Sequence, residues 1–206
     1  FFISPSNGEN ATSSKGIIAT SNPHASKAAH EIIRKGGNAI DAAVAVQLVL
    51  TLTEPQATGI GGGAFMLYWD AKKSKLFAID GREKAPSKAK EDLFLNKDGN
   101  KIKFYPDAVV GAKSVGVPGI IKLLEDTHKK FGKLAWNDLF GYAIELSENG
   151  FSVSPALHNT LGYLSYLKTI EPAGSLYYKK NSDGEKIPVP IGHILKNKEY
   201  AETLRR

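Results

Sequence analysis

The chain has 206 residues, 42% of them hydrophobic and 23% charged, which is an ordinary globular composition with room for a sizeable core. It has no cysteine, which excludes disulfides, thiolate nucleophiles and cysteine-ligated zinc, and no apolar stretch near the roughly 20 residues of a transmembrane helix. The net charge of +6 raises the question of nucleic acid, but the lysines are dispersed and no basic-aromatic alternation occurs, so we expect no nucleic-acid partner.

The first elements follow from turn and capping residues. Residues 1–15 are rich in Ser, Asn, Thr and Gly, and we expect a flexible arm there, including the weak glycosylation sequon at residues 10–12. Residues 16–20 are expected to form a short strand. Asn22 and Pro23 then begin a helix with apolar residues at helical spacing as far as Lys35, where two glycines end it.

A second helix is apolar on nearly every side. Asn38 is placed to cap it, and Glu54-Pro55 ends it. A helix without a polar face must be covered on more than one side. The pattern therefore predicts a layered fold with this helix as an inner element.

A glycine run follows, and Gly59, Gly61 and Ala64 satisfy the letters of a dinucleotide-binding motif. That motif requires a strand before the glycines and a helix after them, whereas here the order is reversed, so a nucleotide site is excluded. The glycines instead indicate close backbone packing or an open pocket wall. Residues 64–70 read as a buried strand, and residues 76–79 pair back on it as a hairpin.

The second half is expected to be mainly helical. One helix runs to Phe131 and ends at Gly132, another is capped by Asn137 and reaches Glu148, and a third begins at Ser154-Pro155. Residues 169–190 read as a loop. An amphipathic helix from about residue 197 runs into the end of the chain, which is how a fragment would end.

The most informative polar segment is DGREKAP at residues 80–86. It places Arg82 between Asp80 and Glu83 directly after a strand, where a guanidinium can offer two charge-assisted hydrogen bonds to a carboxylate. Taken alone, the segment would be assigned to a loop salt bridge. The five histidines form no metal-binding pattern, and we expect no cofactor.

Several motifs in order resemble the γ-glutamyltransferase (γ-glutamyltranspeptidase) family at the start of its large subunit, and the likeness covers essentially everything after Lys15. The motifs are KGGNAIDAA at 35–43, EPQATGIGGGAFML at 54–67, DGREKAP at 80–86, VGVPG at 115–119, ENGFSVS at 148–154 and ILKN at 194–197. One peripheral departure is Gly192-His193, where Gly-Asp is common in relatives.

The resemblance implies an α+β fold of the N-terminal-nucleophile hydrolase type, an αββα sandwich. Residues 16–206 would be the incomplete N-terminal portion of a single domain. It also implies a zymogen that cuts itself into two subunits, so the expected partners are its own small subunit and a γ-glutamyl substrate. We expect a periplasmic or extracellular location, since the apolar start Phe1-Phe2-Ile3 could be the tail of a signal segment.

By the same resemblance, Arg82 matches the arginine that binds the α-carboxylate of the γ-glutamyl group, and Glu83 is expected to orient it. The nucleophile in this family is a threonine at the start of the small subunit, so no catalytic residue is expected here and residues 1–206 alone should be inactive. Glutathione-type transfer or hydrolysis is the leading activity. A poly-γ-glutamate depolymerase, a glutaryl-cephalosporin acylase and a non-catalytic carboxylate-binding relative stay open.

Overall fold

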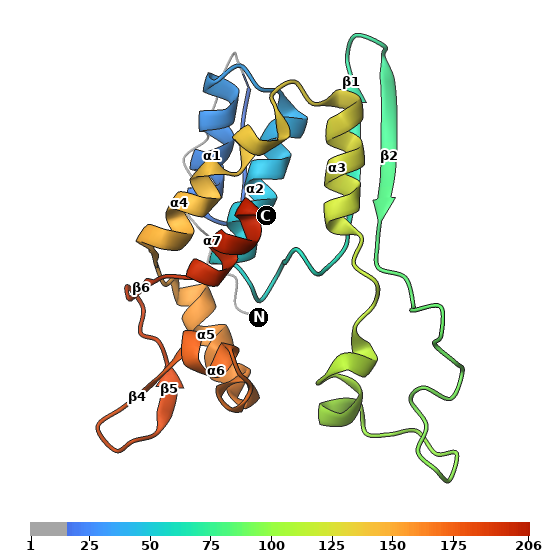
Figure 1. Cartoon of the computed structure of the whole chain (residues 1–206), viewed down its shortest axis with the longest axis vertical. Coiled ribbons are helices and arrows are strands. Elements are labelled where there is room, and N and C mark those ends of the chain that lie inside the picture. Colours follow the sequence, from blue (N-terminus) through green and yellow to red (C-terminus); the bar gives the residue numbers. More distant parts are fainter. Residues whose placement is uncertain (1–15) are drawn as a thin grey trace, which may run out of the picture.

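The computed structural model describes residues 16–206, so the arm and sequon predicted before them lie outside the described residues. Figure 1 shows a helical bundle beside a long hairpin with its own helix. None of the helices in this described part has the length and apolar character to cross a bilayer. The elements are α1 (Pro23–Arg34), α2 (Ala39–Thr53), β1 (Ala64–Asp70), β2 (Lys75–Gly81), α3 (Ile120–Phe131), α4 (Gly141–Asn149), β3 (Phe151–Ser152), α5 (Pro155–Tyr163), α6 (Ala173–Leu176), β4 (Tyr178–Lys180), β5 (Lys186–Pro188), β6 (Ile194–Leu195) and α7 (Lys198–Arg205).

Helix α2 lies at the centre of the bundle and begins with a complete capping box. The side chain of Asn38 accepts hydrogen bonds from the backbone of Ile40 and Asp41, and the Asp41 carboxylate accepts one from the Asn38 backbone. Helices α1, α3 and α4 all pack on α2. The prediction of an inner helix covered on more than one side is therefore confirmed.

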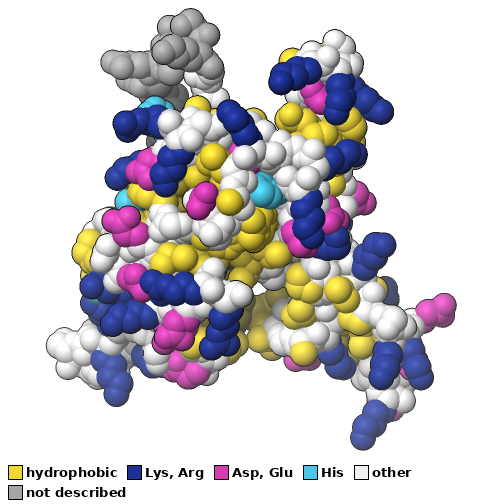
Figure 2. All heavy atoms as spheres, turned by 45° about the horizontal axis from the view of Figure 1, so that its top comes forward, with side chains coloured by type: hydrophobic (Ala, Val, Ile, Leu, Met, Phe, Trp, Pro, Cys, Tyr) yellow, Lys and Arg dark blue, Asp and Glu magenta, His cyan; other side chains and the backbone are white. Residues whose placement is uncertain are grey.

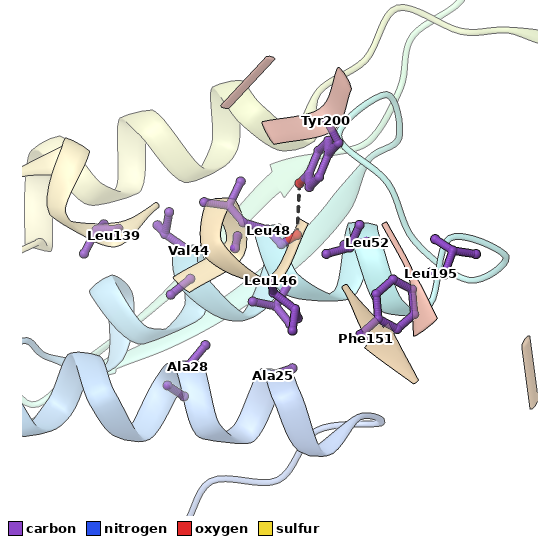
Figure 3. Close-up of a cluster of buried hydrophobic side chains, with 14 of the residues drawn as sticks. Ala25, Ala28, Val44, Leu48, Leu52, Leu139, Leu146, Phe151, Leu195 and Tyr200 are labelled. Atoms are coloured by element: carbon purple, nitrogen blue, oxygen red, sulfur yellow. Dashed lines mark hydrogen bonds between the residues drawn. The ribbon is translucent and has the colours of Figure 1, made fainter. Parts of the chain in front are cut away.

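The core forms where these helices converge. Figure 3 shows Val44 and Leu48 of α2 among side chains from α1, α4 and the β3–β6 pair. Tyr200 reaches in from α7 and donates a 2.9 Å hydrogen bond to the Leu48 carbonyl oxygen. Since β3 pairs antiparallel with β6, the last part of the chain is held against α4 and α2.

The hairpin β1–β2 is antiparallel, and α3 packs against it. On the packed face, the rings of Tyr68 and Phe77 lie 4.8 and 4.9 Å from that of Phe131. The other face is bare in residues 16–206: Phe65, Leu67 and Trp69 are 69%, 74% and 57% exposed. The expected hairpin is confirmed. The prediction that its first strand is buried is wrong for this face, because within the described chain the hairpin is covered on its other face only.

Three local predictions are wrong. Residues 16–20 form no strand, since no described strand pairs with them. Asn137 does not cap a helix but lies in a 3₁₀ turn (Trp136–Leu139), and α4 begins only at Gly141. The expected loop at 169–190 contains α6 and the β4–β5 hairpin, whose short strands meet around a turn at Gly184.

Candidate functional site

The candidate site begins where β2 ends. Gly81 is buried, and the next backbone N–H, that of Arg82, donates a 2.9 Å hydrogen bond to Oδ1 of Asp80. This turn directs the Arg82 side chain outward, where it is 55% exposed. Over half of the side chain is therefore open to a ligand, while one Nη1 atom faces Glu83.

Glu83 lies beside this arginine. Its Oε2 atom is 2.9 Å from an Nη1 atom of Arg82, and the Glu83 side chain is only 25% exposed. The contact is an ion pair without hydrogen-bond geometry: the Oε2 atom is buried and accepts no hydrogen bond from residues 16–206. The carboxylate is thus held by packing and by its attraction to the guanidinium.

Three loops meet at this pair. The carbonyl oxygen of Gly62, in the glycine run, accepts hydrogen bonds from the backbone N–H groups of Gly119 (3.0 Å) and Ile120 (3.1 Å). Lys84 and Val117 pair as an isolated β-bridge, with N–O distances of 2.8 and 3.4 Å. The start of α3 is therefore tied both to the glycine run and to the chain just after Glu83.

The structure places the side chains of Arg82 and Glu83 in contact. It also places the glycine run and the segment before α3 beside them. The glycine run follows α2 and precedes β1, which is the reverse of the order that a dinucleotide site needs. The approach of Gly63 and of Gly116 to Glu83 could not be foreseen from spacing. Within the described part of the chain no three His, Asp or Glu side chains are grouped to hold a metal ion.

The charge on the visible surface is dispersed. Figure 2 shows Lys and Arg side chains scattered over the face, with apolar side chains gathered along its middle. An apolar hollow lies between α2, α3, α4 and α7, lined among others by Leu48, Ile121, Trp136 and Phe140. It is separate from Arg82, which lies on open surface after β2.

Comparison with known proteins gives a consistent result. The family model described as gamma-glutamyltranspeptidase matches residues 25–206. The glutathione hydrolase proenzyme of Bacillus subtilis (strain 168) is 37% identical over 190 residues, which are 92% of this chain and 31% of that relative. The acylase ACY 1 proenzyme of Pseudomonas sp. (strain V22) is 39% identical over 155 residues, 73% of this chain and 28% of the relative.

A solved structure extends the similarity to the fold. The γ-glutamyltranspeptidase of Helicobacter pylori superimposes with a TM-score of 0.86 at 33% sequence identity, covering 96% of this chain and 55% of that one. The α+β fold inferred from the sequence motifs is confirmed. The chain spans about a third of the length of the curated relatives it matches (31% and 28%).

Proposed function

This chain belongs to the γ-glutamyltranspeptidase family, and on that premise we propose that the complete protein transfers or hydrolyses γ-glutamyl groups of glutathione-type substrates. The observation that carries the proposal is the exposed guanidinium of Arg82, fixed at the end of β2 with Glu83 beside it. A carboxylate, such as that of an amino-acid head group, is a ligand that the planar fork of an arginine can bind through two hydrogen bonds.

Arg82 would bind the α-carboxylate of the γ-glutamyl group through two parallel N–H donors. Such charge-assisted bonds are shorter and stronger than neutral ones, and their fork geometry also sets the direction of the bound chain. Glu83 would hold the guanidinium in that orientation, because its Oε2 atom lies 2.9 Å from Nη1. Neither residue would take part in bond making.

The nucleophile, in this proposal, is a threonine in polypeptide outside residues 1–206, exposed as a new N-terminus by self-cleavage. Its α-amino group would remove the hydroxyl proton as the oxygen attacks the γ-carbonyl carbon, with backbone N–H groups stabilising the oxyanion. The protonated α-amino group would return that proton to the leaving amine. Water or an amino acid would then attack the acyl-enzyme, take the γ-glutamyl group and regenerate the threonine hydroxyl. The word proenzyme in the names of the relatives supports this maturation.

It follows that residues 1–206 would be inactive without their partner, the small subunit, with which they would form a heterodimer. We also propose that the enzyme works in the periplasm or outside the cell, which fractionation of the producing cells would test. The similarity to an acylase favours one second candidate activity, removal of a glutaryl group. Glutaryl and γ-glutamyl groups share the carboxylate that Arg82 would bind but differ in the α-amino group.

The test is kinetic and uses the complete protein. Wild type, Arg82→Ala and Arg34→Ala are compared on a γ-glutamyl anilide and on a glutaryl anilide; Arg34 is an exposed arginine on α1 and serves as the control. Loss of a charge-assisted pair should raise KM about tenfold or more for Arg82→Ala, with a smaller change in kcat. If KM and kcat of Arg82→Ala equal those of wild type, Arg82 does not bind the substrate. If the wild-type protein cleaves the glutaryl anilide faster than the γ-glutamyl anilide, the acylase activity is the correct one. If it cleaves neither anilide, both proposed activities are refuted.

A further inference from the structure

Two glycines on different loops close around the Glu83 side chain. An alanine methyl group at position 63 would lie 2.5 Å from Oε2 of Glu83 and 2.8 Å from its Cδ. A methyl group at position 116 would lie 2.8 Å from the Cβ of Glu83. Non-bonded carbon atoms are normally separated by about 3.5–4.0 Å, so neither site admits a side chain while Glu83 stays in place.

Backbone conformation does not explain these glycines. Neither Gly63 nor Gly116 is among the glycines with positive φ, so alanine could adopt their backbone. Other glycines of the same run have open space instead: methyl groups at Gly59 and Gly61 would meet no atom within 4 Å. Gly59 and Gly61 thus have room for a methyl group. Position 63 is closed both by the Glu83 carboxylate and by the carbonyl oxygen of Gly81, 2.7 Å away, whereas position 116 is closed chiefly by the Cβ of Glu83.

Glu83 depends on this packing, because its buried Oε2 atom accepts no hydrogen bond from the described residues. The same oxygen is the one that lies 2.9 Å from Nη1 of Arg82. A displaced carboxylate would thus change the position of the guanidinium. With no hydrogen bond to restore it, the position of the carboxylate depends on the packing around the Glu83 side chain and on its attraction to Arg82.

We propose that Gly63, beside the Glu83 carboxylate, and Gly116, beside the Glu83 Cβ, are positioning residues for substrate binding, forming a slot that fixes the Glu83 side chain and through it the Arg82 guanidinium. This inference rests on the proposed role of Arg82 in binding the substrate carboxylate. Neither glycine touches substrate. Their contribution would lie in the direction in which the arginine fork points, so it should affect KM more than kcat.

The experiment measures KM and kcat of the complete protein on a γ-glutamyl anilide, with thermal midpoints recorded for every variant. Gly63→Ala and Gly116→Ala should each raise KM by up to about fivefold, the contribution of a partly exposed ion pair, with kcat changed less than about twofold. Gly61→Ala is the matched control from the same run and should stay within about twofold of wild type in both constants.

A double-variant cycle separates positioning from simple loss of structure. In a Glu83→Ala background the methyl group at position 63 no longer meets a carboxylate, so Gly63→Ala should add little to the KM of Glu83→Ala alone. A methyl group there also lies 2.7 Å from the carbonyl oxygen of Gly81, so part of any loss of stability will persist. If the effects of Gly63→Ala and Glu83→Ala on KM are not additive, the slot is supported even when the thermal midpoint of the variant is lower than that of wild type.

The outcomes are distinct. A wild-type protein that cleaves no γ-glutamyl anilide refutes the proposed function. A wild-type enzyme sensitive to Arg82→Ala, but with both glycine variants indistinguishable from Gly61→Ala, refutes only the slot. Equal and additive increases in KM for Gly63→Ala in the presence and absence of the Glu83 carboxylate also refute it, as does failure of both glycine variants to fold in either background.

Discussion

The Nε2 atom of His128 lies 3.3 Å from Oδ1 of Asp41, so the last turn of α3 meets the first turn of α2. The same Nε2 atom is 3.0 Å from the carbonyl oxygen of Leu134. A carbonyl oxygen only accepts hydrogen bonds, so Nε2 must carry the hydrogen. Asp41 has no solvent exposure, and it also accepts two bonds from the backbone N–H of Lys133, at 3.0 and 3.2 Å.

Replacing this carboxylate should destabilise the junction of α2 and α3. Asp41→Asn would turn an NH₂ group toward partly buried backbone donors that now have acceptors, which costs about 1–3 kcal/mol per unsatisfied group. We expect a loss of that size in the free energy of unfolding of the complete protein, measured in urea. Asp126→Asn, at an exposed position on α3, is the control, and equal stability of the two variants would contradict the prediction.

Tyr200 should stabilise the bundle through its hydroxyl group. Burial raises the pKa of Tyr200 above its ordinary value, and the hydroxyl donates to the Leu48 carbonyl oxygen. Tyr200→Phe should lower the free energy of unfolding by about 0.5–1.5 kcal/mol, the usual net contribution of one hydrogen bond. The same change at Tyr163, which is 87% exposed, should have almost no effect. Similar urea midpoints for both variants would show that the bond contributes nothing.

His24 should make the fold less stable in mild acid. Partial burial, followed by the charge of Lys27, lowers the pKa of His24 below its ordinary value of 6.5, and its Nδ1 atom lies 3.2 Å from the hydroxyl oxygen of Tyr142. The unfolded state therefore binds a proton more readily. This contribution to stability is complete above about pH 6.5 and is lost as the pH falls through the folded-state pKa.

The expected sign can be read from two variants. His24→Gln should show a smaller fall in thermal midpoint between neutral pH and pH 5 than wild type does. His30→Gln, at an exposed position on the same helix, controls for the change in side chain and should follow wild type. A larger acid loss for His24→Gln would reverse the sign and contradict the assignment.

Glu83→Gln should weaken substrate binding without abolishing it. The glutamine keeps the shape that fits between the loops but loses the charge that attracts Arg82. A partly exposed ion pair contributes up to about 1 kcal/mol, which is about fivefold in KM. Kinetics on a γ-glutamyl anilide would measure this, with Glu125→Gln on the exposed face of α3 as the control. A drop in kcat at constant KM would place Glu83 in the chemistry instead.

Local sequence signals predicted most of the helices because their ends carry identifiable caps. Asn22, Asn38, Ser154 and Asn197 all accept hydrogen bonds at the helix starts. Asn137 looked equally suitable, but the chain makes a 3₁₀ turn there and delays the helix. Capping residues thus identify possible starts, while packing decides which of them is used.

The candidate site could be proposed only from the motifs as a set. The position of Arg82 after a strand suggested a carboxylate-binding group, but charge pattern alone could not distinguish it from a loop ion pair. Contacts between residues 63 and 83, or 83 and 116, depend on how three loops fold against one another. No periodicity in the sequence encodes that arrangement.

The exposed apolar face of the β1–β2 hairpin has a consequence for how the newly made chain folds. Three large apolar side chains in a row, at positions 65, 67 and 69, will associate with any similar surface they meet. While this face is uncovered, a newly made chain exposes it to neighbouring chains, so aggregation should compete with folding.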